Sequence, residues 1–162
     1  MYNTGMKEIP ERVYVDSSVV SGMFDSNDHP TRVKPFWDAV FNGKIRVVLS
    51  DVLVDEIERA PQHVRDFYES IPKSQIERVV STEESDALAE QYVAVGIVAE
   101  KSLNDCRHVA LAAAARVDVL VSFNCKHIVK LNRIRRYNAI NMLHGYPTIE
   151  IRTPDEVIYD ET

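Results

Sequence analysis

The sequence contains few cysteines and few glycines, and each shortage excludes a class of protein. Two cysteines among 162 residues, Cys106 and Cys125, are too few for a disulfide framework and indicate a reducing compartment such as the cytoplasm. Five glycines leave no Gly-rich phosphate loop, which excludes the Walker and dinucleotide-binding motifs. A Gly-x-Ser-x-Gly elbow for a nucleophilic serine is also missing.

Long apolar runs and an excess of basic charge are missing as well. No apolar run reaches the ~18 residues that a membrane span needs, and the N-terminal MYNTGMKEIPERV has no apolar segment typical of a secretion signal. A net charge of -6 argues against a protein that holds nucleic acid by bulk electrostatics alone. A nuclease is still possible, because carboxylates that bind a metal ion themselves make the charge negative. We therefore expect a cytoplasmic protein that does not enter a membrane.

The length and the hydropathy pattern predict a single α/β domain over residues 1–162, with a core at about 12–157 and short, loosely held ends. Strand-like runs that are continuously apolar alternate with helical patterns, which is typical of a parallel sheet covered by helices on both faces. We expect four or five parallel strands. The expected strands lie at 13–15, 45–49, 76–80, 118–121 and 148–151. A first helix is expected to begin at 17 or 18, and further helices are expected at 31–41, 51–60, 61–70, 83–95, 103–117 and 126–132.

In such a sheet, functional groups gather beyond the carboxyl ends of the strands, where the following helices begin. Four polar residues of the sequence are predicted to lie there. Asp16 closes the first strand, and Glu56 lies in the second turn of the helix after the second strand. Asp105 lies in the first turn of the most apolar helix, and Asn124 comes just after the strand at 118–121. We expect all four to face the same edge of the sheet.

Each of these residues also has an ordinary structural interpretation. Asp105 lies three residues after Ser102 and is a candidate for the acidic partner of a capping box. Glu56 has acidic neighbours, as on a solvated helix face, and Asn124 suits a plain turn. Asp16 is the hardest to explain in this way, because a carboxylate after three apolar strand residues is costly to bury unless it is paired or bound to a metal. A role as helix N-cap is the alternative for Asp16.

Taken together, the four residues indicate a metal site. Carboxylates crowded at one edge repel each other and raise their own pKa values unless a cation neutralises them. Oxygen ligands select a hard divalent ion, Mg²⁺ or Mn²⁺. Such an ion lowers the pKa of a bound water molecule and stabilises displacement at phosphorus, which indicates hydrolysis of a phosphodiester.

Four sequence blocks resemble, in order and spacing, the motif blocks of PIN-domain proteins. They are Val13-Tyr14-Val15-Asp16-Ser17-Ser18, Leu49-Ser50 followed by Glu56, the segment 104–112 (NDCRHVALA) and the segment 120–127 (LVSFNCKH). The match runs from about 12 to 124, and the tail to about 157 resembles one branch of the family. PIN-domain proteins are Mg²⁺- or Mn²⁺-dependent ribonucleases, and many prokaryotic members are VapC-type toxins paired with an antitoxin.

The resemblance implies that Asp16, Glu56 and Asp105 are metal ligands and, with Asn124, form the catalytic group. It also implies that Ser122 supports the site through hydrogen bonds. The sequence departs from the family pattern at Asn124, where many members carry a fourth acid, and at Ser18, where the family often has Asn, in the supporting position next to Asp16. An amide oxygen can bind a metal ion but brings no charge, so a second metal site is expected to be weak or absent.

Basic residues directly after Asn124 form a local positive patch that we expect to contact RNA phosphate. Lys126 and Arg133 are the predicted substrate-binding members, and Lys130, Arg135 and Arg136 extend the patch. The three arginines are expected to lie in a turn. His127 either touches substrate phosphate or is a structural histidine. A zinc site made of Cys106-x-His108 and Cys125-x-His127 is disfavoured, because residues i and i+2 of a helix point apart.

The sequence therefore predicts a metal-dependent endoribonuclease, a hydrolase that cleaves RNA phosphodiester bonds and acts as the toxin of a toxin–antitoxin pair. Its expected partners are an RNA substrate and a small antitoxin protein, and the resemblance implies a homodimer. The alternative is a PIN-fold module with attenuated catalysis that binds RNA or a protein partner, and Asn124 is the residue that favours it.

Overall fold

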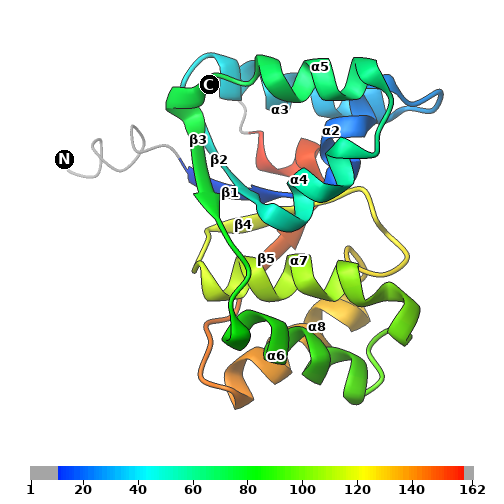
Figure 1. Ribbon diagram of the computed structural model, residues 1–162, viewed down its shortest axis with the longest axis vertical. Helices are drawn as coiled ribbons and strands as arrows, with labels where there is room; N and C mark the ends of the chain where they lie inside the picture. Colours follow the sequence, from blue (N-terminus) through cyan, green and yellow to red (C-terminus); the bar gives the residue numbers. More distant parts are fainter. Residues whose placement is uncertain (1–10, 159–162) are drawn as a thin grey trace.

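A computed structural model describes residues 11–158 of the chain. Five strands form one parallel sheet in the order β3-β2-β1-β4-β5, with β1 in the centre (Figure 1). The predicted α/β class and parallel sheet are therefore confirmed. The strands are β1 (Glu11–Val15), β2 (Ile45–Ser50), β3 (Ile76–Val79), β4 (Val119–Val121) and β5 (Glu150–Arg152).

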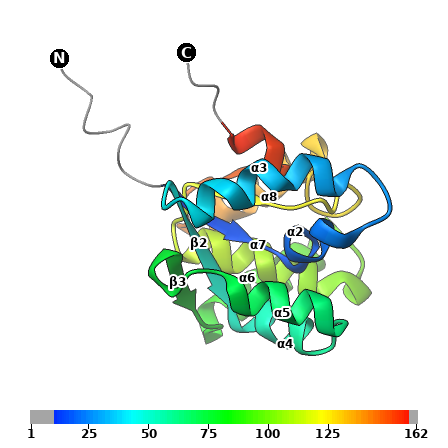
Figure 2. The same cartoon turned by 90° about the horizontal axis from the view of Figure 1, so that it is seen from above.

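Helices cover both faces of the sheet (Figures 1 and 2). One layer contains α2 (Ser17–Ser21), α3 (His29–Phe41), α4 (Asp51–Glu58) and α5 (Gln62–Ser70), and the other contains α6 (Glu83–Ala94), α7 (Leu103–Ala114) and α8 (Leu131–Leu143). Four short 3₁₀ helices complete the described elements: η1 (Gly22–Phe24), η2 (Lys73–Gln75), η3 (Glu100–Ser102) and η4 (Pro154–Val157).

The central strands are apolar throughout because both of their faces are buried. In β1, Val13 and Val15 belong to the core under α2, α3 and α5, whereas Tyr14 belongs to the core under α6, α7 and α8. All three side chains are fully buried. Side chains of a strand alternate between faces, so a run of three apolar residues supplies both cores. The helix α7 is buried around most of its circumference, as its composition predicts.

The segment after β4 differs from the prediction. Residues 125–128 form a turn rather than a helix, in which the backbone N–H groups of Ile128 and Val129 donate to the Asn124 carbonyl, and residues 131 and 132 already belong to α8. The arginines predicted to lie in a turn are instead part of the helix α8. Arg136 of α8 donates to the Val95 and Gly96 carbonyls at the end of α6. This contact between segments distant in the sequence favours the helical conformation of α8 here.

The predicted loose ends of the domain, residues 1–10 and 159–162, lie outside the described residues. Within residues 11–158, no helix is long and apolar enough to cross a membrane.

Candidate metal centre

Asp16 lies at the carboxyl edge of the sheet, where β1 and β4 end side by side. Val15 is in register with Val121, so the residues that follow them, Asp16 and Ser122, meet at this edge. The Asp16 side chain is 4% exposed. Its Oδ2 accepts a hydrogen bond of 2.5 Å from the Ser122 hydroxyl, and its Oδ1 accepts from the Ser18 hydroxyl at 2.5 Å and from the Ser18 N–H at 3.1 Å. Asp16 is thus both the N-cap of α2 and a buried carboxylate held by two serines.

The same two serines fix the loop that follows β4. The Ser18 oxygen accepts from the Phe123 N–H at 2.9 Å, and the Ser122 oxygen accepts from the Asn124 N–H at 2.9 Å. Each hydroxyl therefore gives its proton to Asp16 and takes one from the loop backbone. The supporting role predicted for Ser122 and Ser18 stays a prediction, and these hydrogen bonds are the contacts on which it would depend.

Asp105 lies in the first turn of α7 and faces Asn124. Asp105 is not part of a capping box, because the Ser102 side chain makes no hydrogen bond that caps α7. Burial raises the pKa of Asp105 and the charge of Asp16 adds to the shift, whereas His127, His108 and a hydrogen bond from Asn124 oppose it. The negative charge of Asp16 therefore disfavours the ionisation of Asp105.

Asn124 contacts both its own turn and Asp105. Its amide oxygen accepts from the His127 N–H at 2.9 Å, and its side chain is hydrogen-bonded to Asp105. A carboxylate can only accept, so the amide nitrogen of Asn124 donates to it. Asn124 thus contacts Asp105 and closes its own turn, and its predicted role as an oxygen ligand stays a prediction.

Glu56 reaches the same region from α4 but is held by a histidine. Its Oε1 lies 2.7 Å from His108 Nε2 on α7, and the Glu56 side chain is 23% exposed. Burial raises the pKa of Asp16, and the charge of Glu56 contributes to this shift, although His108 and the two serine hydroxyls oppose it. Glu56 therefore belongs electrostatically to the group of acids at this edge.

The donor set fits a hard divalent ion in its chemistry. Among residues 11–158, no group of three or more His, Cys, Asp or Glu side chains is placed so that it could hold a metal ion. However, Asp16 and Asp105 are neighbouring carboxylates whose pKa values burial raises, which is the situation that a cation relieves. Asp16 Oδ2 accepts one hydrogen bond and keeps a second lone pair for a ligand bond, whereas Oδ1 already accepts two. Mg²⁺ and similar ions commonly use one or two carboxylates and retain several water molecules.

A family model described as PIN domain matches residues 12–126, a range that contains all four predicted catalytic residues. The chain belongs to the PIN-domain family. No curated protein matches the sequence of this PIN domain.

Two solved structures share the fold of this PIN domain at low sequence identity. One is the Mycobacterium tuberculosis toxin VapC20, which cleaves the sarcin–ricin loop: it is 14% identical with a TM-score of 0.55, over 71% of this chain and 92% of that chain. The other is VapBC2 from Rickettsia felis, bound to a DNA fragment from its promoter: it is 12% identical with a TM-score of 0.56, over 86% of this chain and 98% of that chain. These similarities establish the fold.

The predicted substrate-binding residues of this PIN domain have three different environments. Lys126 is exposed in the turn directly after Asn124. The Nδ1 atom of His127 is buried and has no hydrogen-bond partner among the described residues. The Arg133 guanidinium donates to the Ile97 carbonyl at the end of α6, so this arginine makes a structural contact. Of the three, only Lys126 presents an exposed charge.

Sequence reasoning missed Tyr14 and His108, which belong to this site. Tyr14 was treated as one of three apolar strand residues, and His108 was considered only as part of a zinc pattern. His108 is 2% exposed and lies in a helix that is otherwise Ala-rich and apolar. A buried polar side chain needs a hydrogen-bond partner. A histidine in a helix predicted to be buried is therefore the signal that could have indicated a polar contact at His108.

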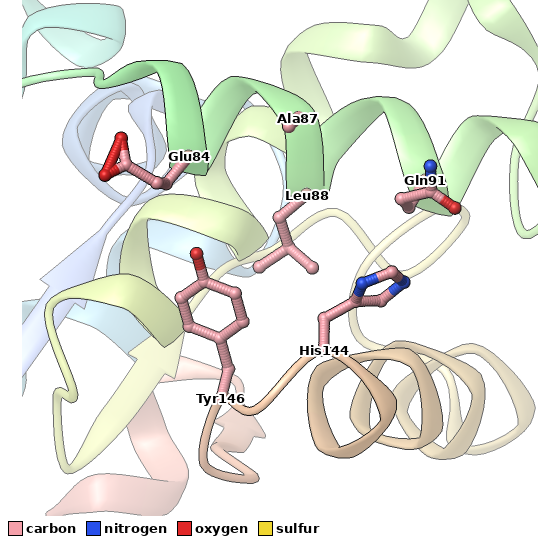
Figure 3. A pocket seen from close by; sticks show the side chains of 6 residues that line it. All are labelled: Glu84, Ala87, Leu88, Gln91, His144 and Tyr146. Atoms are coloured by element: carbon pink, nitrogen blue, oxygen red, sulfur yellow. The ribbon is translucent and has the colours of Figure 1, made fainter.

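A surface pocket of about 270 Å³ lies elsewhere in this PIN domain (Figure 3). It is formed by α6 and by the segment that follows α8. None of the predicted site residues lines it, so the candidate metal centre is an open edge rather than this pocket. Its lining residues are Glu84, Ala87, Leu88, Gln91, His144 and Tyr146.

Proposed function

We propose that this PIN domain is an endoribonuclease that depends on Mg²⁺ or Mn²⁺. The observation that carries the proposal is Asp16, a carboxylate buried at the carboxyl edge of a parallel sheet, whose charge adds to the raised pKa of the partly buried Asp105. Membership of the PIN family, which contains nucleases, supports the same conclusion.

In this proposal Asp16, Asp105 and Glu56 hold the ion, and the other residues hold the ligands in place. Ser18 and Ser122 keep the Asp16 carboxylate facing the edge, because both hydroxyls donate to it. A bound divalent ion supplies positive charge that acidifies a water molecule and offsets the charge that develops on the phosphate. Since burial favours the protonated carboxylates, binding of the ion is expected to displace protons from them.

We place the RNA backbone along the turn that follows Asn124. Lys126 is exposed there and carries the charge that a phosphate group needs. The buried Nδ1 of His127 lacks a partner, which favours a role for this ring beside the substrate or in orienting the turn. Arg133 lies close to this turn in the sequence, and this position alone supports it as a candidate for phosphate binding, because its guanidinium already contacts the Ile97 carbonyl.

We further propose that the protein acts as the toxin of a toxin–antitoxin pair in the cytoplasm. The two solved structures with this fold support the proposal, because one is a toxin that cleaves RNA and the other is a toxin–antitoxin complex. The expected partner is then a small antitoxin protein encoded next to this chain, and the expected assembly is a homodimer. Co-expression with the adjacent small protein, followed by co-purification, tests this part.

RNA cleavage with and without divalent ions tests the catalytic proposal. Wild-type protein is expected to cleave RNA with Mg²⁺ or Mn²⁺ and to lose cleavage after chelation. Asp105→Asn is expected to abolish cleavage, whereas Asp38→Asn, at an exposed position on α3, is expected to leave it unchanged. Full activity of Asp105→Asn would contradict the proposal. RNA binding without cleavage by the wild type would favour the attenuated binding module instead.

A further inference from the structure

A continuous chain of hydrogen bonds runs from the sheet to Glu56. The Ser50 hydroxyl lies 2.7 Å from the Tyr14 hydroxyl, and the Tyr14 hydroxyl lies 2.7 Å from His108 Nδ1. His108 Nε2 lies 2.7 Å from Glu56 Oε1. Ser50, Tyr14 and His108 are all buried, and Glu56 is the one member with a partly exposed side chain. The chain joins β2, β1, α7 and α4 in that order.

The number of protons on these four side chains determines which atom donates in each hydrogen bond. Glu56 as a carboxylate has no proton to give, so His108 Nε2 must be the donor. In the neutral ring, Nδ1 then accepts from the Tyr14 hydroxyl, and the Tyr14 oxygen accepts from Ser50. The Ser50 oxygen in turn accepts the Leu53 N–H at 3.1 Å. With the ring neutral, every donor and acceptor along these hydrogen bonds is satisfied. Against the effect of burial, Glu56 raises the pKa of His108, and in the protonated ring Nε2 still donates to Glu56 while Nδ1 donates to the Tyr14 oxygen.

We propose that His108 is a positioning residue that holds Glu56 for metal binding. This inference rests on the proposed function, in which Glu56 is one of the ligands. Glu56 is on the partly exposed face of α4 and has several rotatable bonds, so without a partner it would sample many orientations. His108 fixes one of its oxygens and leaves the other free. The charges of Asp16 and Asp105 also reach the His108 ring, which places all three acids around one group.

A purely structural role does not account for this arrangement. The other buried side chains of this helix are cysteine, valine, leucine and alanine, so an apolar side chain of similar size would pack at position 108 without a desolvation cost. Tyr14 packs edge-on against the ring, with centroids 5.6 Å apart and an angle of 69° between the planes. Partners that orient metal ligands in this way commonly change metal affinity or activity about 10- to 100-fold when they are removed.

A matched pair of substitutions separates the two bonds of His108. In His108→Asn the amide lies near the position of Nδ1, so it can contact Tyr14 but is too short for Glu56. In His108→Gln the amide lies near the position of Nε2, so it can still donate to Glu56. The experiment measures Mn²⁺ affinity by titration calorimetry and the melting temperature of each metal-free variant. His108→Asn is expected to bind Mn²⁺ about 10- to 100-fold more weakly than wild type, whereas His108→Gln keeps most of the affinity.

A double-mutant cycle with Glu56→Ala tests whether His108 acts through Glu56. In the Glu56→Ala background, His108→Asn is expected to cause no further loss of Mn²⁺ affinity, and Glu58→Ala, at an exposed position on α4, is the control. Equal affinities of folded His108→Asn and His108→Gln would overturn the inference, as would an undiminished loss in the Glu56→Ala background. No Mn²⁺ binding by the wild type would instead overturn the proposed function, and the inference with it.

Discussion

Asp16 and Ser122 are 106 residues apart in the sequence, yet the Ser122 hydroxyl donates to the buried Asp16 carboxylate at 2.5 Å. The contact follows from the register of the two central strands, which end side by side at Val15 and Val121. Ser122 also accepts from the Asn124 N–H, so one hydroxyl links the carboxylate to the loop that orients Asp105. The geometry of both acids therefore depends on this serine.

Ser122→Ala is expected to lower the free energy of unfolding by about 1–3 kcal/mol, because it leaves a buried carboxylate oxygen and a loop N–H without their partner. Chemical denaturation measures the change. Ser70→Ala, at an exposed position at the end of α5, is the control and is expected to change stability by less than about 0.5 kcal/mol. Equal effects of the two substitutions would show that the Asp16–Ser122 contact contributes nothing.

Asp16→Asn is expected to make the metal-free protein more stable at neutral pH. Burial raises the pKa of Asp16, so the charged form is disfavoured in the folded state relative to the unfolded chain. Replacement by a neutral amide removes that cost and also removes the repulsion of Asp105. Thermal unfolding in the presence of a chelator is expected to give a higher melting temperature for Asp16→Asn than for wild type. A lower melting temperature would indicate that the serine hydrogen bonds outweigh the burial of the charge.

The same shift predicts how the difference between these two proteins varies with pH. A carboxyl group with a raised pKa in the folded state binds its proton more tightly there than in the unfolded chain. The contribution of Asp16 to the free energy of unfolding is therefore fully present below about pH 4, the ordinary pKa of aspartate. It is lost as the pH rises through the raised pKa of the folded state. The advantage of Asp16→Asn over wild type in free energy of unfolding should grow with pH across this window. A difference that stays constant with pH would contradict the raised pKa.

Asn124→Asp is expected to destabilise the metal-free protein and to strengthen Mn²⁺ binding. The amide of Asn124 donates to Asp105, and a carboxylate at this position would repel it instead. A cation offsets that repulsion, so the added charge favours metal binding. Melting temperatures and Mn²⁺ titrations of the same preparations measure both effects. A lower Mn²⁺ affinity in Asn124→Asp would indicate that the donor to Asp105 matters more than the charge.

Gly22→Ala is expected to disturb the loop that carries Asn124. A Cβ atom at Gly22 would lie 2.9 Å from the Phe123 ring, which is itself stacked on His29 at 3.9 Å between ring centroids. Overpacking of this kind costs about 1–3 kcal/mol, and here it would displace Phe123, whose N–H donates to Ser18. Denaturation of Gly22→Ala with and without Phe123→Leu tests the cause. The smaller leucine should recover part of the stability, and no recovery would exclude the clash with Phe123.

The fold could be predicted from the sequence because its signals are local. Three-residue apolar runs such as Val13-Tyr14-Val15 predict strands buried on both faces, and the rule that sites lie at the carboxyl edge of a parallel sheet then selects Asp16 and Asp105. The partners of these acids were partly predictable. Ser122 was expected to support the site, but the role of Asn124 as a donor depends on which atom of its amide faces the loop.

The remaining contacts could not be predicted because they join distant segments. His108 and Glu56 are 52 residues apart, and no periodicity in either helix indicates that they meet. The arginines of α8 gave the pattern of a charged turn, yet Arg136 caps α6 from 41 residues away. In both cases the partner is a polar group made available by tertiary packing, which the local pattern does not contain.

Titration of Mn²⁺ into the metal-free protein at neutral pH tests the central claim most directly. Wild type and Asp38→Ala should bind Mn²⁺ saturably, with release of protons, and Asp16→Ala should not bind it. Because Asp38 lies at an exposed position on α3, this comparison separates a carboxylate site at the sheet edge from general attraction to an acidic protein. Equal binding by wild type and Asp16→Ala, or no binding by either, would contradict the assignment of the metal centre.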